Sequence, residues 1–150
     1  MSTEPTPSPE LAPIHQGSCL CGGIRFTLSG TLPPIQVCHC SQCRRAQGGP
    51  FATNVPIQES QLRWLSGEDL IQVYDSSDDK QRCFCQRCGS PLFSRRASLP
   101  GVLRLRAGLL EGDFGSRVGL HMHWASRAPW WGDDEDGTPH HEAGLEPQAQ

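Results

Sequence analysis

The eight cysteines of this 150-residue chain gather in three short clusters, which span residues 19–21, 38–43 and 83–88. The first residues contain neither a cationic start nor an apolar stretch, so we see no secretory signal and expect a cytoplasmic, reducing environment. Disulfides rarely persist in such an environment, and clustered thiolates there more often hold a metal ion. The cysteines therefore predict metal sites, with zinc as the first candidate.

The first and third clusters predict one zinc site with four ligands. Cys85 and Cys88 have the two-residue spacing that lets both sulfurs converge on one ion, and Gly89 relaxes the backbone that follows. Cys19 and Cys21 can supply the second pair, because residues two apart in an extended chain share a face about 6.6 Å apart. Closure by four thiolates is typical of structural zinc, which contributes on the order of 10 kcal/mol or more to folding.

The middle cluster offers three thiolates, Cys38, Cys40 and Cys43, and no obvious fourth ligand. Catalytic zinc keeps one coordination position open for water or substrate, whereas structural zinc is saturated by the protein. The incomplete set therefore predicts a second, more open zinc, which a thiol could enter. Cys83 has the same strand parity as Cys85, and we interpret it as a buried small hydrophobic residue rather than a spare ligand.

The histidines have alternative interpretations. Alternation along a strand turns His39 away from its cysteine neighbours, which favours a packed or hydrogen-bonding histidine over a metal ligand. His121 and His123 share one face of a strand, so either could approach a metal site, or both could be satisfied surface residues. Two further histidines, at 140–141, lie in a predicted tail and are expected to be inert.

The net charge of −3 hides an uneven distribution. All 13 basic residues lie between positions 25 and 127, whereas eight of the 16 acidic residues lie outside 14–132, so the middle of the chain carries 13 minus 8, or +5. Twelve of the 13 basic residues are arginine, which grips carboxylate or phosphate in a bidentate manner. An anionic ligand is one interpretation, and a solvated basic surface is the other.

Short segments of period-two alternation, separated mostly by Gly, Pro, Ser and Asp, predict a mainly β, multi-stranded fold. The expected strands cover residues 24–28, 35–40, 51–57, 62–65, 71–74, 82–85, 102–107 and 118–124. One helical turn is possible at 41–46. No segment approaches the eighteen apolar residues of a membrane span, so we expect no membrane partner.

The composition predicts one folded domain between two disordered tails. The length suits a single domain, and residues 14–132 show neither a repeat nor a linker-like break. Residues 1–13 contain four prolines, and residues 133–150 are acidic and nearly free of large apolar groups. Such segments have too little apolar surface to offset the entropy of ordering them.

The cysteine motifs resemble those of the glutathione-dependent formaldehyde-activating enzyme (GFA) family, which also includes centromere-protein-V-like proteins. The resemblance spans about residues 17 to 131. Its motifs are Gly17-Ser18-Cys19-Leu20-Cys21-Gly22-Gly23, Cys38-His39-Cys40-Ser41-Gln42-Cys43-Arg44-Arg45, Phe84-Cys85-Gln86-Arg87-Cys88-Gly89-Ser90, Ala107-Gly108-Leu109-Leu110-Glu111 and Leu120-His121-Met122-His123-Trp124.

The resemblance implies an Mss4-like β fold with two zinc ions per chain. The structural ion would be held by Cys19, Cys21, Cys85 and Cys88, and the more exposed ion by the three cysteines at 38–43. It further implies a carbon-sulfur lyase that joins glutathione and formaldehyde into S-hydroxymethylglutathione near the second zinc.

Under this interpretation, a small thiol such as glutathione would bind at the open zinc position and lose its proton, since metal coordination deprotonates thiols. The neighbouring Arg44 and Arg45 could hold the carboxylates of the substrate. Ser41 or Asn54 could donate a hydrogen bond to the developing alkoxide.

Two non-enzymatic hypotheses remain. The first is a zinc-built binding module for an acidic protein partner or nucleic acid; the scattered arginines, an aromatic content of only 7% and the acidic tail make nucleic acid the less favoured partner. The second is a thiol redox sensor built on the middle cysteine cluster, which would form disulfides reversibly and release zinc.

Overall fold

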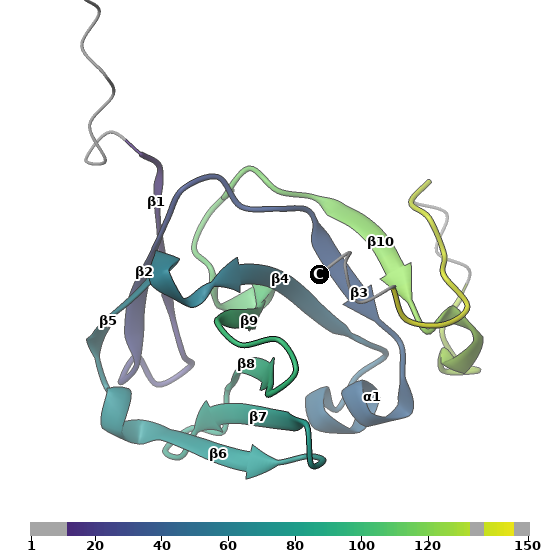
Figure 1. Ribbon diagram of the computed structural model, residues 1–150, viewed down its shortest axis with the longest axis horizontal. Helices are drawn as coiled ribbons and strands as arrows, with labels where there is room; N and C mark the ends of the chain where they lie inside the picture. The colour runs from purple at the N-terminus through teal and green to yellow at the C-terminus, as the bar shows by residue number, and fades with distance from the viewer. Residues whose placement is uncertain (1–11, 133–136, 146–150) are drawn as a thin grey trace, which may run out of the picture.

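The computed structural model of the protein describes residues 12–132 and 137–145 (Figure 1). Among these residues the chain forms ten strands and one α-helix, α1 (Ser41–Gln47). The strands are β1 (Ile14–Ser18), β2 (Arg25–Ser29), β3 (Ile35–Cys38), β4 (Ala52–Gln58), β5 (Leu62–Ser66), β6 (Ile71–Asp75), β7 (Lys80–Cys85), β8 (Pro91–Arg96), β9 (Val102–Arg106) and β10 (Val118–Met122). Short 3-10 turns occur at Glu59–Gln61, Glu68–Leu70, Ala107–Leu109 and Trp124–Ser126. The prediction of a mainly β fold is confirmed.

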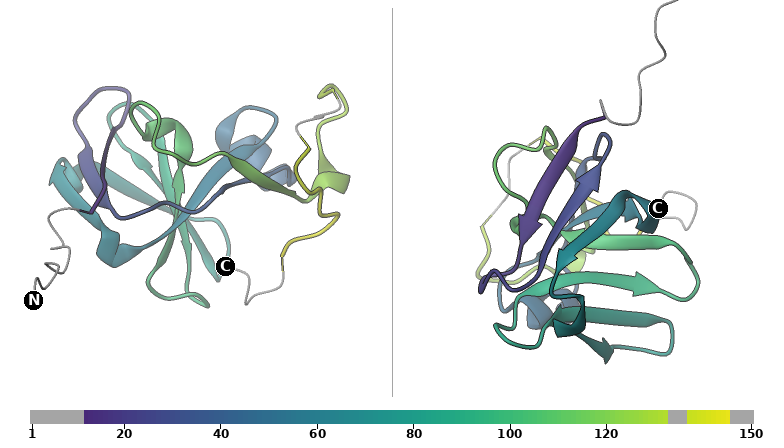
Figure 2. Two further views of the ribbon diagram at one scale, coloured as in Figure 1. Left: turned by 90° about the horizontal axis from the view of Figure 1, so that it is seen from above. Right: turned by 90° about the vertical axis from the view of Figure 1, so that its left-hand side faces the viewer.

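The strands form two sheets, whose different orientations are visible in Figure 2. The smaller sheet has the order β1-β2-β5, and the larger has the order β10-β3-β4-β9-β8-β7-β6. All pairings in both sheets are antiparallel except that of β10 with β3, which is parallel. Because β10 pairs with β3 and Met122 lies opposite Cys38, the end of β10 comes close to the middle cysteine cluster.

All eight predicted strands are present, with ends that differ by a few residues, and the helical turn expected at 41–46 is part of α1. Two strands, β1 and β8, were not predicted. The sequence of β1, Ile-His-Gln-Gly-Ser, carries little apolar alternation, and β8 begins with a proline. Pairing with β2 forms β1, and pairing with both β7 and β9 forms β8, so tertiary contacts override weak local propensity.

One face of the larger sheet packs against the smaller sheet. Buried side chains from β2, including Phe26 and Leu28, belong to the same hydrophobic cluster as Val55 of β4 and Leu105 of β9. Cys83 is also buried in this cluster, as predicted. The opposite face of the larger sheet is thereby left for other contacts.

Residues 137–145 correct the expectation that 133–150 forms a disordered tail with inert histidines. The segment runs beside β10: His121 N–H donates to the carbonyl of Pro139 at 2.8 Å, and His141 N–H donates to the carbonyl of His121 at 2.9 Å. The ring of His140 stacks on Trp124 with centroids 3.7 Å apart. These contacts pair the outer edge of β10 and bury aromatic surface, which the acidic composition of the segment concealed. Residues 1–11, 133–136 and 146–150 lie outside the described residues.

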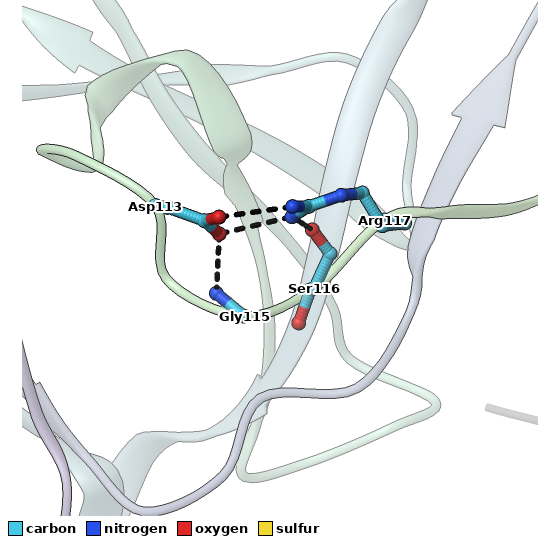
Figure 3. Close-up of polar contacts among 4 residues, drawn as sticks. All are labelled: Asp113, Gly115, Ser116 and Arg117. Atoms are coloured by element: carbon cyan, nitrogen blue, oxygen red, sulfur yellow. Dashed lines mark hydrogen bonds and ion pairs between the residues drawn. The ribbon is translucent and has the colours of Figure 1, made fainter.

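Hydrogen bonds and an ion pair hold the loop that leads into β10 (Figure 3). The guanidinium of Arg117 donates to both carboxylate oxygens of Asp113 at 2.9 Å, and Gly115 N–H donates to the same carboxylate at 2.9 Å. These hydrogen bonds hold the pKa of Asp113 well below its usual range. The hydroxyl of Ser116 donates to the carbonyl of Leu32 at 3.0 Å and so ties the loop to the segment before β3. No helix of the described chain has the length and apolar character needed to span a membrane.

Candidate metal centre

Four cysteines from two distant turns meet in one cluster. Cys19 and Cys21 lie between β1 and β2, Cys85 ends β7, and Cys88 lies in the turn before β8. Their sulfurs all lie within 4.8 Å of one another; the Cys19 and Cys21 sulfurs are 3.5 Å apart, and those of Cys21 and Cys85 are 3.9 Å apart. Four sulfurs around a tetrahedral zinc with bonds of about 2.3 Å would be roughly 3.8 Å apart. The donor set and its spacing therefore fit zinc.

The surroundings of this four-cysteine cluster favour the thiolates of Cys21 and Cys88, whereas burial raises the pKa of Cys85. Ile24 N–H donates to the sulfur of Cys19 at 3.3 Å, and Gly23 N–H donates to that of Cys21 at 3.4 Å. The hydroxyl of Ser90, 3.2 Å from the sulfur of Cys88, lowers the pKa of that thiol to about 5. Such hydrogen bonds stabilise the deprotonated ligands that a metal ion requires.

A second cluster is built where β3 meets α1. Cys38 ends β3, Cys40 is the N-cap of α1, and Cys43 lies in its first turn. The Cys40 sulfur accepts the N–H of Cys43 at 3.3 Å, so the capping contact that starts the helix also brings the two side chains together. The three sulfurs lie within 4.8 Å of one another, and among the described residues no fourth Cys, His, Asp or Glu joins them.

A basic side chain influences this three-cysteine cluster. The thiols of Cys38 and Cys40 donate to Cys43, which lowers the pKa of Cys43, while the contacts with Cys40 and Cys43 raise the pKa of Cys38. Nη2 of Arg82 lies 3.8 Å from the sulfur of Cys43, and Arg82 is buried. These contacts favour the thiolate of Cys43.

The three cysteines line a cavity of about 660 Å³. Its other walls come from the face of the larger sheet that points away from the core, and from Met122, His123 and Leu145. A cavity of this size suits a small organic molecule. The chain therefore places an incomplete ligand set beside a space that a substrate can occupy.

Basic residues dominate that sheet face. Along β7 and β9 the residues alternate between core positions such as Leu103 and Leu105 and outward positions such as Arg104. The register aligns Lys80 with Arg96, and Arg104 with Ser94. Five of the chain's basic residues share this face: Lys80, Arg82, Arg96, Arg104 and Arg106.

The structure separates the predicted substrate-binding residues into two groups. Ser41 and Asn54 line the cavity, and Asn54 is buried with its amide oxygen accepting a hydrogen bond from the buried Arg106. Arg44 and Arg45 are not among the described residues that line it. The charge of Arg44 instead contributes to lowering the pKa of His39.

Sequence reasoning missed three basic residues that do line the cavity: Lys80, Arg96 and Arg104. For Lys80 and Arg104 a signal was present in the strand pattern, because basic residues alternate with core residues in β7 and β9. Arg44 and Arg45 were predicted instead because they directly follow Cys43 in the sequence. The strand pairing that brings β7, β8 and β9 beside the cysteines could not be deduced from the sequence alone.

The histidines occupy distinct places around the cluster. His39 and His121 are both buried, and Nε2 of His39 lies 2.8 Å from Nδ1 of His121, which agrees with a hydrogen-bonding rather than ligating His39. Burial, with smaller contributions from nearby charges, lowers the pKa of His39 to about 4. His121 is therefore not a surface residue, whereas His123 lines the cavity.

Comparison with known proteins agrees with this cysteine architecture. The family model described as glutathione-dependent formaldehyde-activating enzyme, GFA, matches residues 14–127, which contain both cysteine clusters. The chain belongs to the GFA family. This membership confirms the resemblance that the cysteine motifs indicated.

Individual relatives and one solved structure are similar to this GFA protein. It is 31% identical over 107 residues to a Halomonas elongata protein named as a putative glutathione-dependent formaldehyde-activating enzyme, covering 67% of this chain and 68% of the relative. It is also 31% identical over 100 residues to an uncharacterized lyase of Schizosaccharomyces pombe, covering 67% and 71%. A crystal structure of a Rhodobacter sphaeroides protein superposes with a TM-score of 0.56 at 27% identity, covering 69% of this chain and 98% of that one.

Proposed function

We propose that this GFA protein is a zinc-dependent carbon-sulfur lyase that joins a small thiol such as glutathione to formaldehyde or another small aldehyde. The observation that carries the proposal is the position of Cys38, Cys40 and Cys43: three sulfurs within 4.8 Å of one another on the wall of a 660 Å³ cavity. Relatives with a glutathione-dependent formaldehyde-activating name support the choice of substrates.

The three-cysteine cluster fits a zinc ion with one open coordination position, because its three thiol donors are the soft ligands that zinc takes and no fourth described side chain completes the set. When bound there, zinc supplies a Lewis acid that favours the deprotonated form of a thiol. Arg82 lies 3.8 Å from the sulfur of Cys43 and stabilises its thiolate. The contact thus supports the deprotonated form of one of the three ligands, Cys43.

The reaction forms one bond between the thiol sulfur and the aldehyde carbon. The π pair of the C=O bond moves onto oxygen, and that oxygen takes up the proton that the thiol lost, so the product is a hydroxymethyl thioether. The amide nitrogen of Asn54, whose oxygen is already engaged by Arg106, is a hydrogen-bond donor for the developing alkoxide. Ser41, at the cavity wall, is the second candidate donor.

The four-cysteine cluster has a structural role in this proposal. Its ligands come from the β1–β2 turn of the smaller sheet and from the β7–β8 turn of the larger sheet. A zinc ion bound there would hold the two sheets together at one end, and the free energy of zinc binding would contribute to the free energy of folding.

A cytoplasmic location remains a prediction.

Exchange-sensitive NMR tests the proposed activity. Formaldehyde and glutathione combine spontaneously, so the rate of S-hydroxymethylglutathione formation is compared with and without the zinc-loaded protein. We expect acceleration by the wild type and none by Cys40→Ser, which lacks one ligand of the three-cysteine cluster. A rate equal to the spontaneous one, from protein with confirmed zinc content, would refute the lyase assignment.

A further inference from the structure

The outer edge of β6 is an unpaired strand edge at one end of the larger sheet (Figure 1). The other end of that sheet, β10, is covered by residues 137–145, and the edge of β1 has a bridge from Gly17 to Leu110. β6 pairs with β7 along its whole length without a register shift, and in the part of the chain that the structure describes no other strand pairs with it. This edge is therefore open to an added strand.

The hydrogen-bond pattern of β6 shows which backbone groups are open. Gln86 N–H donates to the carbonyl of Leu70 at 2.9 Å, so these two residues form a hydrogen-bonded pair at the start of the β6–β7 ladder. Because bonded and non-bonded pairs alternate along an antiparallel ladder, the backbone groups of even-numbered residues point to β7. Those of Val73 and Asp75 point to the open edge. An added strand thus has N–H donors and carbonyl acceptors waiting at every second residue.

An apolar groove of about 400 Å³ lies between the two sheets and reaches β6. Ile71 and Val73 of β6 line it, together with Cys83 of β7, Phe93 of β8 and Trp64 of β5. Val73 is 38% exposed, whereas Cys83 and Phe93 are buried, so the groove deepens from the β6 edge toward the core. In strand addition, the backbone supplies hydrogen bonds and such pockets receive alternate side chains of the added segment.

The charge of the segment that contains β6 is entirely negative. Residues 67–79 include five acidic residues and no basic one. Four of the five are exposed and form no ion pair within the described residues: Glu68, Asp69, Asp75 and Asp78. Antiparallel pairing of β6 with β6 of a second copy would bring these acidic ends together, and like charges across a strand pair are destabilising. A basic segment, in contrast, complements the charge at both ends of the strand.

We propose that the outer edge of β6 binds an extended, basic segment of another protein by strand addition. Apolar side chains at alternate positions of that segment lie beside Ile71 and Val73, and lysines or arginines at its ends lie near Asp69 and Asp78. The site is independent of the proposed lyase chemistry, because the groove lies on the core-facing side of the larger sheet and the cysteine cavity lies on the opposite side.

A synthetic peptide tests the proposal on the intact chain at about 0.15 M salt, which screens long-range attraction. The probe, acetyl-Lys-Lys-Val-Thr-Val-Thr-Val-Lys-Lys-amide, has valines at alternate positions and lysines at both ends. We expect isothermal calorimetry to show one bound peptide per chain. A peptide with glutamate in place of every lysine should bind at least about tenfold more weakly, because its charges repel those of the segment.

Two further peptides separate strand addition from attraction by charge alone. N-methylvaline in place of the central valine removes one backbone donor and should weaken binding about fivefold to tenfold. Serine in place of every valine keeps the lysines and should also weaken binding, because it leaves the groove unfilled. If the serine peptide and the N-methylated peptide bind as tightly as the probe, strand addition is refuted.

Hydrogen exchange measured by NMR locates the bound probe. The amides of Val73 and Asp75 should exchange at least about tenfold more slowly when the probe is bound, because they gain hydrogen bonds. The amides of Gln72 and Tyr74, which already point to β7, should change little. Protection at another strand edge, or none at Val73, would overturn the proposal.

Variants of the chain provide a second check. Asp69→Asn combined with Asp78→Asn should weaken the probe about threefold to tenfold, the range for two exposed ion pairs. Glu111→Gln, an exposed acidic residue outside the segment, is the matched control and should change nothing. Both substitutions are at exposed sites, and thermal melts establish that the variants fold. Wild-type affinity in the double variant would contradict the role given to the acidic residues.

Sedimentation equilibrium distinguishes a partner segment from a second copy of the chain. We expect the probe to bind without changing the oligomeric state. Dissociation of a dimer by the probe would show that a second copy occupies the β6 edge, and the proposal would be wrong.

Discussion

Arg82 places its guanidinium 3.8 Å from the sulfur of Cys43, although the two residues are 39 positions apart in the chain. Both are buried, and Arg82 also donates through Nε to the hydroxyl of Ser76 at 3.2 Å. The contact links β7 to α1 and brings a fixed positive charge to the three-cysteine cluster. It connects the basic sheet face to the candidate metal ligands.

Replacement of this arginine should weaken metal binding at the three-cysteine cluster. In Arg82→Met, the Cys43 thiolate loses a charged donor, and groups of this kind around a metal site are typically worth 10–100-fold in affinity. Competition with a chromophoric zinc chelator measures the effect, and Arg63→Met is the control. An unchanged zinc affinity in Arg82→Met would show that the contact does not support the metal ligands.

The two cysteine clusters should differ in what they contribute to stability. Cys88→Ser removes a ligand that joins the two sheets, so we expect unfolding or aggregation, because structural zinc contributes on the order of 10 kcal/mol to folding. Cys40→Ser removes a ligand shared only between β3 and α1, and the fold should remain while one zinc is lost. Circular dichroism and thermal melts measure whether each variant is folded, and zinc analysis measures how many ions it retains. Equal destabilisation by the two substitutions would make the second site structural too.

The segment 137–145 should stabilise the fold, contrary to what its composition suggested. Truncation after residue 136 removes the hydrogen bonds to β10, the His140–Trp124 stack and the contact of Leu145 with the three-cysteine cluster. We expect a loss of about 1–3 kcal/mol in the free energy of unfolding, measured by urea titration. Leu145→Ser should reproduce part of the loss, and the exposed Glu142→Ser should not. A truncated chain as stable as the full chain would show that the segment does not pack.

His39 should remain neutral well below neutral pH. Burial lowers its pKa from 6.5 to about 4 in the folded chain, so between these values the unfolded chain binds a proton that the folded chain does not. This difference makes the stability contributed by His39 fall as the pH falls through that window. Ring resonances in an NMR titration of the folded protein provide the measurement. A protonation midpoint for His39 at or above 6.5 would contradict the buried His39–His121 pair.

The sequence allowed both cysteine groupings to be predicted because metal-ligand spacing is local. Cys38, Cys40 and Cys43 lie within six residues, and the Cys85–Cys88 pair needs only one turn. Cys19 and Cys21 are more than sixty residues away from that turn. They could still be assigned to the same site, because structural zinc takes four ligands and these two cysteines form the other close pair. The alternation of apolar residues was likewise sufficient for eight strands.

Long-range packing explains what the sequence did not reveal. Arg104 reaches the cavity because β9 pairs with β4 and β8, and nothing local to Arg104 specifies those partners. The segment 137–145 is held by backbone hydrogen bonds to the edge of β10, which any sequence without interfering prolines could form. Amino-acid composition indicates how much apolar surface a segment can bury, but it does not indicate whether its backbone pairs with a strand.

The central claim is that a thiol binds through its sulfur at the cluster of Cys38, Cys40 and Cys43. Isothermal calorimetry of the zinc-loaded chain with glutathione and with S-methylglutathione tests it most directly, because the two ligands share their charges and differ at the sulfur. We expect glutathione to bind at one equivalent, S-methylglutathione to bind at least tenfold more weakly, and Cys40→Ser to lose the difference. Equal affinity of the wild type for the two ligands would contradict the claim.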